Sequence, residues 1–194
     1  LNIRDGGWSP TAGLVVAWLY ALGRIGATPA LRRPLQGALL TASVLWLAGT
    51  VALAMRPGPG PAMPDLALVA LDGRTVAMGQ FSGKPVVVNL WATWCPPCVR
   101  EMPVLQQAQA EYPEVHFVFV NQAEPRSRVA DWLRARNMDL RHVLLDDTGR
   151  FGAAVGQRAL PTTLFFDARG QLAGQRVGEL SPATLRQHLQ ALQR

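Results

Sequence analysis

A long apolar stretch lies near the start of the chain. Residues 35–55 contain no charged side chain. At 1.5 Å per residue, a helix over these twenty-one positions is about 31 Å long, which matches the bilayer's hydrocarbon core of roughly 30 Å. A buried helix of a soluble protein rarely lacks polar side chains all round, and a signal peptide has a shorter apolar core. The pattern therefore predicts a membrane-spanning helix over 35–55.

A second apolar stretch, residues 8–22, precedes the first. It holds three aromatic side chains that suit the membrane–water interface: Trp8, Trp18 and Tyr20. Fifteen residues is short for a membrane span, and an interfacial helix or a helix packed against the other span is the alternative. We predict a second span over about 8–23.

Basic residues lie between the two stretches. Arg24, Arg32 and Arg33 occur there without an acidic residue. The positive-inside rule places such a loop in the cytoplasm, so we expect the chain after Met55 on the opposite side, which is the periplasm in a Gram-negative-type cell. The sequence begins with Leu1 rather than Met, and we expect a processed chain or the last part of a larger multi-pass protein.

A segment rich in proline and glycine separates this region from the rest of the chain. Residues 56–64 are RPGPGPAMP, with four prolines and two glycines. Such a composition is typical of a stiff, non-helical spacer. We therefore predict a membrane region over 1–56, a linker over 57–64 and one globular domain over 65–194.

The globular part alternates between two hydrophobic periodicities. Residues 86–91, VVVNLW, form a nearly continuous apolar run, as expected for a strand buried on both faces. Residues 96–110 carry Val99, Met102 and Leu105 on one stripe of a helix. The same patterns predict a hairpin over 66–78 around Asp72-Gly73, strands over 116–120, 142–145, 162–167 and 171–177, and helices over 127–136, 148–155 and from Pro182 onward. This order predicts an α/β sandwich around a central mixed sheet.

Composition and charge exclude several classes of protein. Apolar residues make up 49% and charged residues 16%, which excludes a disordered chain. The net charge is +6, of which residues 1–56 carry +4 (5 basic, 1 acidic) and residues 57–194 carry +2 (14 basic, 12 acidic). The basic balance is therefore no argument for a nucleic-acid partner, which would require basic residues clustered on one face of the folded domain. We expect no nucleic acid.

Both cysteines lie in one motif, Cys95-Pro96-Pro97-Cys98, between the predicted strand and the predicted helix. Unpaired N–H groups and the positive end of a helix dipole stabilise a thiolate, so we expect the pKa of Cys95 to lie below its usual value of about 8.5. Prolines are tolerated in a first helical turn and stiffen the ring that a disulfide closes. The spacing favours a redox-active pair in which Cys95 attacks a substrate disulfide and Cys98 resolves the mixed disulfide.

A structural disulfide or a metal site would use the same two cysteines. A bridge between residues three apart closes a very short loop and contributes little stability. A metal ion would need two further ligands, and His116, His142 and His188 are scattered over two predicted strands and the last helix. The pattern therefore predicts no metal, and no cofactor besides the redox-active cysteine pair.

The motif WATWCPPC, preceded by a buried strand and followed by RExP, resembles the thioredoxin superfamily. More narrowly, the chain is similar over about residues 62–194 to the TlpA/ResA-like membrane-anchored thiol–disulfide oxidoreductases. Pro103, eight residues after Cys95, and the LPTT sequence at 160–163 strengthen the resemblance. It implies a thioredoxin-like fold, here preceded by one or two transmembrane helices.

The resemblance also implies a substrate-binding set. It implies a cis peptide bond before Pro161, with the proline ring beside the sulfur of Cys95. It further implies that the backbone of Leu160 pairs with an extended substrate segment. An ordinary trans proline at a strand start is the alternative. Trp94, which we expect to cover the dithiol, and Pro96 complete the predicted substrate-binding residues.

One position departs from the thioredoxin pattern. Classical thioredoxins carry a buried acid six residues before the first cysteine, where this chain has Asn89, and an amide cannot exchange a proton at ordinary pH. ResA-like reductases have an acid three residues after the second cysteine, where this chain has Glu101. We hypothesise that Glu101 acts with Cys95 and Cys98 as the catalytic set, as general acid/base at the dithiol. A solvated glutamate paired with a nearby arginine is the alternative.

Together these features predict a membrane-tethered, periplasm-facing enzyme of the bacterial inner membrane that reduces disulfides in client proteins. The resemblance implies recharging by a membrane electron donor such as a DsbD-like protein, and clients such as apocytochrome c during cytochrome c maturation. A periplasmic thiol oxidase is the alternative, because the same chemistry runs in both directions and the potential decides. From a different class, a copper-binding assembly factor would use the dithiol as a ligand.

Overall fold

The computed structural model describes the following parts of the chain: Ala17, Tyr20, residues 29–54 and residues 60–192. The chain divides into two compact units, the second of which begins at Gly58, and each unit is described by itself. Except for Ala17 and Tyr20, which are helical, the membrane span predicted over 8–23 lies outside the described residues.

In the first unit, residues Pro29–Ala54 form helix α2. Its Gly37–Ala54 segment is long and apolar enough to cross a membrane, by length and composition. Large apolar side chains along it are exposed, with Leu45 at 73%. The helix begins earlier than the predicted span, because proline is favoured at the first helical position. It therefore includes Arg32 and Arg33, which the sequence analysis placed in a loop.

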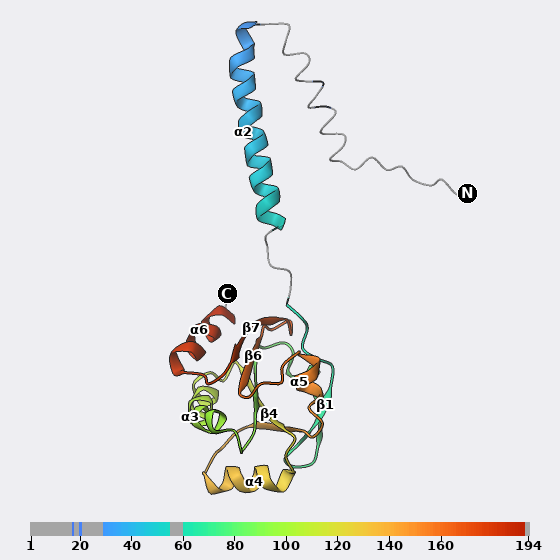
Figure 1. The fold of residues 1–194 in the computed structure, drawn as a ribbon, viewed down its shortest axis with the longest axis vertical. Helices are drawn as coiled ribbons and strands as arrows, with labels where there is room; N and C mark the ends of the chain where they lie inside the picture. Colours follow the sequence, from blue (N-terminus) through green and yellow to red (C-terminus); the bar gives the residue numbers. More distant parts are fainter. Residues whose placement is uncertain (1–16, 18–19, 21–28, 55–59, 193–194) are drawn as a thin grey trace, which may run out of the picture. The chain divides into compact units, whose positions relative to one another are not determined.

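The second unit is built around a seven-stranded mixed sheet (Figure 1). In the order in which they lie side by side, its strands are β2 (Thr75–Ala77), β1 (Ala67–Ala70), β5 (His142–Asp146), β4 (His116–Gln122), β3 (Val86–Trp91), β6 (Thr162–Phe166) and β7 (Leu172–Val177). β3, β4 and β5 are parallel, and the other pairings are antiparallel. The carboxyl ends of β3, β4 and β5 therefore lie at one edge of the sheet, and the two cysteines follow β3 at that edge.

Helices cover both faces of this sheet. The core on one face includes residues of α3 (Pro96–Glu111), α4 (Arg126–Ala135) and α6 (Pro182–Leu192), and the core on the other includes residues of η2 (Met78–Phe81) and α5 (Arg150–Ala154). Successive strand residues point to opposite faces. Val87 and Trp91 of β3 belong to the core beneath α3, whereas Val86 and Val88 belong to the other core. Asn89 shares the alternation of Val87 and Trp91, so it faces α3.

The predicted α/β sandwich with a mixed sheet is confirmed, with differences at the ends of elements. β3 begins and ends where the apolar run predicts, and β4 continues two residues past its predicted end, to Gln122. The hairpin predicted over 66–78 has shorter strands than expected, because the short helix η2 follows β2 directly. That helix was not predicted.

The predicted linker ends before residue 64. The N–H of Met63 donates to the carbonyl of Gly170 (2.8 Å), and the N–H of Leu172 donates to the carbonyl of Pro61 (3.0 Å). These backbone bonds attach residues 61–63 to the start of β7. The segment therefore belongs to the globular unit rather than to a free spacer.

Gly60 lies where this segment comes close to β7. A Cβ atom at Gly60 would overlap the carbonyl oxygen of Leu172, so Gly60→Ala requires the backbone to move. We expect the variant to lose about 1–3 kcal/mol of unfolding free energy, as overpacked sites do. Urea unfolding followed by circular dichroism measures this, with Gly79→Ala as the control, since no heavy atom lies within 4 Å of a Cβ there. Equal stability of the two variants would contradict the close contact.

Candidate active site

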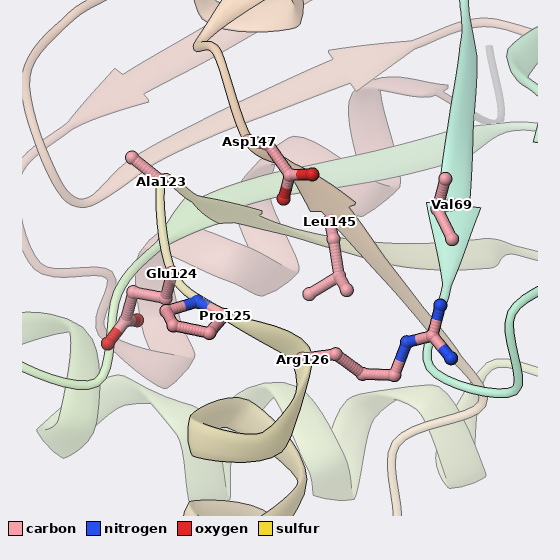
Figure 2. Close-up of a pocket in the computed structure, with 7 residues that line it drawn as sticks. All are labelled: Val69, Ala123, Glu124, Pro125, Arg126, Leu145 and Asp147. Atoms are coloured by element: carbon pink, nitrogen blue, oxygen red, sulfur yellow. The ribbon is translucent and has the colours of Figure 1, made fainter.

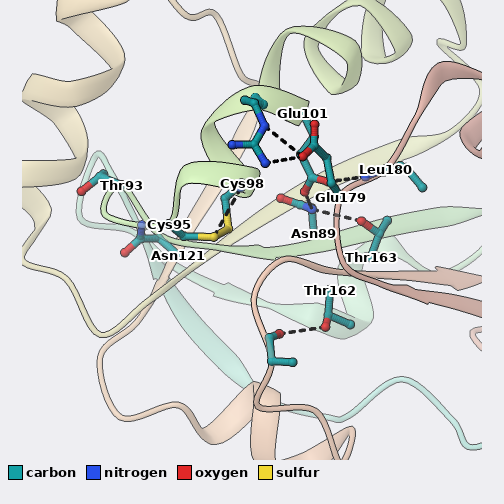
Figure 3. The surroundings of a disulfide bond; sticks show 12 residues. Asn89, Thr93, Cys95, Cys98, Glu101, Asn121, Thr162, Thr163, Glu179 and Leu180 are labelled. Carbon is teal, nitrogen blue, oxygen red and sulfur yellow. Dashed lines mark hydrogen bonds and ion pairs between the residues drawn. A yellow bond between two sulfur atoms is a disulfide. The ribbon is translucent and has the colours of Figure 1, made fainter.

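Cys95 and Cys98 form a disulfide at the amino end of α3 (Figure 3). Cys95 is the N-cap of the helix, and the two prolines occupy its first turn. The backbone N–H of Cys98 donates to the sulfur of Cys95 at 3.3 Å. Cys95 is 4% exposed and Cys98 is fully buried. Cys95 therefore carries the sulfur that a partner protein can reach, and a first-turn N–H group points at it.

The loop before β6 lies at the same edge of the sheet. The Leu160–Pro161 peptide bond is cis, which confirms the bond that the resemblance implied, while the place of the proline ring beside the Cys95 sulfur stays a prediction. Leu90, near the end of β3, pairs with Thr162 at the start of β6. Leu160 and Pro161 therefore continue past the end of β3, toward the segment that carries Cys95.

The predicted substrate-binding residues differ in exposure. Trp94 is a large apolar side chain that is 63% exposed next to the disulfide, and Pro96 is also exposed. Leu160 is half-buried and Pro161 is buried. Trp91, which we expected in the core, is fully buried. These positions offer apolar surface around Cys95, and their role in substrate binding stays a prediction.

Glu101 lies one turn after Cys98 on the buried face of α3. It is 1% exposed, and its two carboxylate oxygens accept hydrogen bonds from the side-chain amide of Asn89 (2.8 Å) and from the backbone N–H of Leu180 (2.8 Å). Burial raises the pKa of Glu101 from 4.5 to about 7, and the two hydrogen bonds oppose this rise only in part. The carboxyl group can therefore take up and release a proton near neutral pH.

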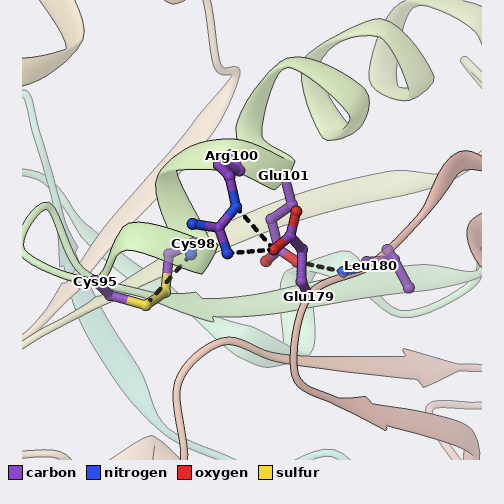
Figure 4. Close-up of polar contacts among 6 residues, drawn as sticks. All are labelled: Cys95, Cys98, Arg100, Glu101, Glu179 and Leu180. Atoms are coloured by element: carbon purple, nitrogen blue, oxygen red, sulfur yellow. Dashed lines mark hydrogen bonds and ion pairs between the residues drawn. A yellow bond between two sulfur atoms is a disulfide. The ribbon is translucent and has the colours of Figure 1, made fainter.

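The alternative of a solvated Glu101 paired with an arginine is wrong. The neighbouring Arg100 pairs instead with Glu179, at 2.6 Å on the surface (Figure 4). No basic side chain of the described residues forms an ion pair with Glu101. The charge of Glu179 raises the pKa of Glu101 slightly further.

Asn89 lies at the centre of this buried arrangement. Besides its bond to Glu101, its amide nitrogen donates to the hydroxyl of Thr163 (3.0 Å), while its amide oxygen has no hydrogen-bond partner. The sequence analysis noted Asn89 only as a departure from the thioredoxin pattern. The available signal was a polar residue inside an apolar strand, because a buried polar side chain needs a partner.

A second buried carboxylate supports the segment before the disulfide, and the sequence analysis missed it. Glu124 is 4% exposed and accepts hydrogen bonds from the backbone N–H of Thr93 (2.7 Å), from the hydroxyl of Thr93 and from the amide of Asn121 (2.8 Å). Thr93 lies two residues before Cys95. Glu124 therefore connects the redox-active loop to the loop after β4.

An open pocket of about 340 Å³ lies beside Glu124 (Figure 2). Its lining comes from β1, from the ends of β4 and β5 and from the start of α4: Val69, Ala123, Glu124, Pro125, Arg126, Leu145 and Asp147. Figure 2 shows the Arg126 side chain extended toward β1. Because its walls include the ends of β4 and β5, the pocket lies at the same edge of the sheet as the disulfide.

The contacts of Glu124 predict a large loss of stability in Glu124→Gln. The N–H of Thr93 and the amide of Asn121 donate to the same carboxylate oxygen, and the Thr93 hydroxyl donates to the other. A glutamine can keep the first two bonds through its own oxygen, but its amide then faces the hydroxyl, whose proton loses its acceptor, and all of these bonds lose the carboxylate's charge. Hydrogen bonds to a charged group are worth about 1.5–3 kcal/mol each, so we expect a loss of about 2–3 kcal/mol. Urea unfolding checks this against Asp147→Asn, an exposed carboxylate of the same pocket, which we expect to change by less than about 0.5 kcal/mol. Equal stability of both variants would contradict the buried network.

Two of the three histidines lie at the opposite edge of the sheet from the disulfide. His116 and His142 begin β4 and β5, and their rings lie 5.9 Å apart and pack against Phe81, a proximity that the sequence did not reveal. His188 stacks on Phe165, with 4.2 Å between ring centres. Among residues 29–54 and 60–192, no three His, Cys, Asp or Glu side chains are grouped as metal ligands.

The part of the chain that carries this site matches a known family. Residues 59–191 match the family model described as Redoxin. The chain belongs to the Redoxin family.

Individual relatives agree with this assignment. This Redoxin is 30% identical over 135 residues to the thiol-disulfide oxidoreductase ResA of Geobacillus thermodenitrificans, covering 69% of this chain and 77% of ResA. It is 30% identical over 140 residues to the thiol:disulfide interchange protein DsbE of Escherichia coli K12, covering 69% and 72%. The solved structure of MTB DsbF, in mixed oxidised and reduced forms, superposes with a TM-score of 0.63 at 30% identity, covering 69% of this chain and 98% of DsbF.

The fold, the cysteine pair and the relatives together define the activity. This Redoxin is a thiol–disulfide oxidoreductase of the ResA/DsbE type, with Cys95 and Cys98 as its cysteine pair.

Proposed function

We propose that this Redoxin is a membrane-tethered reductase that faces the periplasm and reduces disulfides in client proteins, cytochrome c precursors among them. The observation that carries the proposal is the Cys95–Cys98 disulfide at the amino end of α3, in a chain similar to ResA and DsbE. The reducing direction follows from the family resemblance, and a membrane electron donor of the DsbD type is the proposed source of electrons.

The chemistry proceeds in two exchange steps. The thiolate of Cys95 attacks one sulfur of the client disulfide, forms a mixed disulfide and releases the other client sulfur as a thiolate. The Cys98 thiol loses its proton to Glu101, and its thiolate then attacks the Cys95 sulfur. The client leaves with both sulfurs reduced, and Cys95 and Cys98 form the disulfide seen in the structure. Two electrons pass to the client, and the electron donor must return them.

The proposed tether is α2. Its Gly37–Ala54 segment has the length and composition of a membrane anchor, and the large apolar side chains along it are exposed. An anchor confines the enzyme to the membrane surface and raises its effective concentration near partners that are also bound there. This arrangement favours dedicated membrane-bound donors and clients over freely diffusing ones.

Capture of the client tests the proposal. In Cys98→Ser, the mixed disulfide at Cys95 cannot be resolved, so intact cells that express the full chain should accumulate disulfide-linked adducts. We expect proteins with cysteine pairs exported to the periplasm, cytochrome c precursors included, and no adducts with Cys95→Ser. Adducts with cytoplasmic proteins alone would overturn the proposed location.

The reduction potential decides the direction. A strong periplasmic oxidant such as DsbA has a potential near −120 mV. We expect the full chain to be clearly more reducing, and a value above about −150 mV would instead favour a thiol oxidase. Stoichiometric copper binding without disulfide reductase activity would favour an assembly factor.

A further inference from the structure

The side chains of Glu101 and Thr163 are joined through Asn89 by two buried hydrogen bonds beneath α3 (Figure 3). Asn89 comes from β3, Glu101 from α3 and Thr163 from β6, and each is at most 1% exposed. Because none of them can turn to water, each donor or acceptor that is left unmatched within the protein costs free energy in either protonation state of Glu101.

The bonds that the structure shows fit the ionised carboxylate. One Glu101 oxygen accepts from Asn89 and the other accepts from the N–H of Leu180. The amide nitrogen of Asn89 uses one proton for Glu101 and the other for the hydroxyl of Thr163. The amide oxygen of Asn89 is left without a partner.

A protonated Glu101 reverses the requirement at Asn89. The carboxyl O–H needs an acceptor, and the amide nitrogen that faces it is a donor. A half-turn of the amide group exchanges its nitrogen and its unpartnered oxygen, and it places the two N–H donors where the oxygen had no partner. The oxygen then accepts from Glu101, and it also accepts from Thr163, because a hydroxyl group can donate as readily as it accepts.

We propose that Asn89 is a positioning residue whose amide rotates when Glu101 gains or loses its proton, so that the buried proton has a hydrogen-bonded partner in both states. The use of that proton at the dithiol rests on the proposed function. The charged and titratable groups around Glu101 are Glu179, which forms an ion pair with Arg100, and the thiol of Cys98 in the reduced enzyme. The groups that β3 and β6 supply to these hydrogen bonds, Asn89 and Thr163, are uncharged.

Nuclear magnetic resonance of the isotope-labelled full chain in detergent micelles tests the rotation directly. At pH 9, the side-chain N–H₂ protons of Asn89 should show nuclear Overhauser effects to Thr163. At pH 5 those effects should be lost. The pH at which half of their intensity is lost should equal the pH midpoint of the chemical shift of the Glu101 carboxyl carbon. Unchanged effects across this range, or a Glu101 carboxyl that does not titrate within it, would overturn the proposal.

Two variants separate the rotation from a general effect of pH. Asn89→Leu identifies the Asn89 signals by their absence, and Glu101→Gln should leave the Asn89 signals constant with pH, because glutamine does not titrate. Signals that still change in Glu101→Gln would contradict the coupling. If the amide rotates but client turnover does not depend on Glu101, the rotation stands and the proposed catalytic use of the proton falls.

Discussion

Replacing Cys95 by serine is expected to reduce disulfide turnover to the uncatalysed rate, and replacing Cys98 by serine is expected to stop the cycle after one capture. The attacking group is a thiolate, and a serine hydroxyl is not ionised at neutral pH. In Cys98→Ser the sulfur of Cys95 still attacks, but no second thiol is present to displace the client. Insulin reduction by the full chain in detergent, with dithiothreitol as the electron source, measures turnover. Mass spectrometry measures capture after the reduced enzyme has been freed of dithiothreitol and mixed with insulin, because dithiothreitol itself would displace the client from Cys95.

The two variants control for each other. Each removes the same disulfide, which closes a very short loop and contributes about 2 kcal/mol by loop closure. The loss of this crosslink is therefore common to both variants and cannot by itself explain a difference in activity between them. We expect one equivalent of mixed disulfide with Cys98→Ser and none with Cys95→Ser, because Cys95 is the more accessible member of the pair, at 4% exposed against 0% for Cys98. Capture through Cys98 instead would contradict this assignment.

Local patterns were sufficient to predict most elements of the domain. A strand buried on both faces is a continuous apolar run, so β3 could be bounded from the sequence. Proline favours the first turn of a helix, so the start of α3 at Pro96 could be predicted as well. The pairing of residues 61–63 with the start of β7 could not, because it joins segments more than 100 residues apart.

The polar part of the site was less predictable, because helical periodicity assumes that an acidic residue faces solvent. The predicted stripe of α3 contained Val99, which is only half-buried. The buried face includes Glu101 and Gln109 instead. Glu101 entered the prediction through the family resemblance. Glu124 had no signal at all, since its partner Thr93 lies 31 residues away.

A second large effect is expected in the pH dependence of stability when Glu101 is replaced by glutamine. Folding raises the pKa of Glu101 from 4.5 to about 7, so the folded state binds this proton more tightly than the unfolded state. The stabilising contribution of Glu101 to the unfolding free energy is therefore fully present below pH 4.5 and is lost as the pH rises through about 7. A shift of this size corresponds to about 3 kcal/mol. A glutamine side chain does not titrate, so the unfolding free energy of Glu101→Gln does not fall in this way as the pH rises.

The histidines act in the opposite direction, and the comparison removes them. Burial lowers the pKa of His116, His142 and His188, so their neutral forms are favoured by folding and stability is lost as the pH falls below about 6.5. The three histidines are present in both the wild type and Glu101→Gln, so their contribution cancels when the two unfolding free energies are subtracted. In urea unfolding between pH 4.5 and 8.5, the unfolding free energy of the wild type minus that of Glu101→Gln should fall by about 3 kcal/mol. A constant difference would contradict the raised pKa.

The same proton also connects stability to the rate of the reaction. At pH 7 Glu101 is ionised in about half of the chains, and in those chains it can accept the proton of the Cys98 thiol. General acid–base catalysis contributes typically 10²–10⁴-fold, and we expect release of the mixed disulfide to slow by about 100-fold in Glu101→Gln. Capture by Cys95 should change little, because Glu101 shares the buried face of α3 with Cys98. Stopped-flow measurement separates the two steps.

A neighbouring carboxylate provides the matched control for this rate effect. Glu179 is exposed and paired with Arg100, and its charge raises the pKa of Glu101. In Glu179→Gln, release of the client should therefore stay fast, and the midpoint of its pH dependence should move slightly downward. In Glu101→Gln, release should no longer show this midpoint. Equal slowing of capture and release in Glu101→Gln would mean that Glu101 acts by holding Leu180 and Asn89 in place. A selective loss of release, with its pH dependence, is the signature of proton transfer at Cys98.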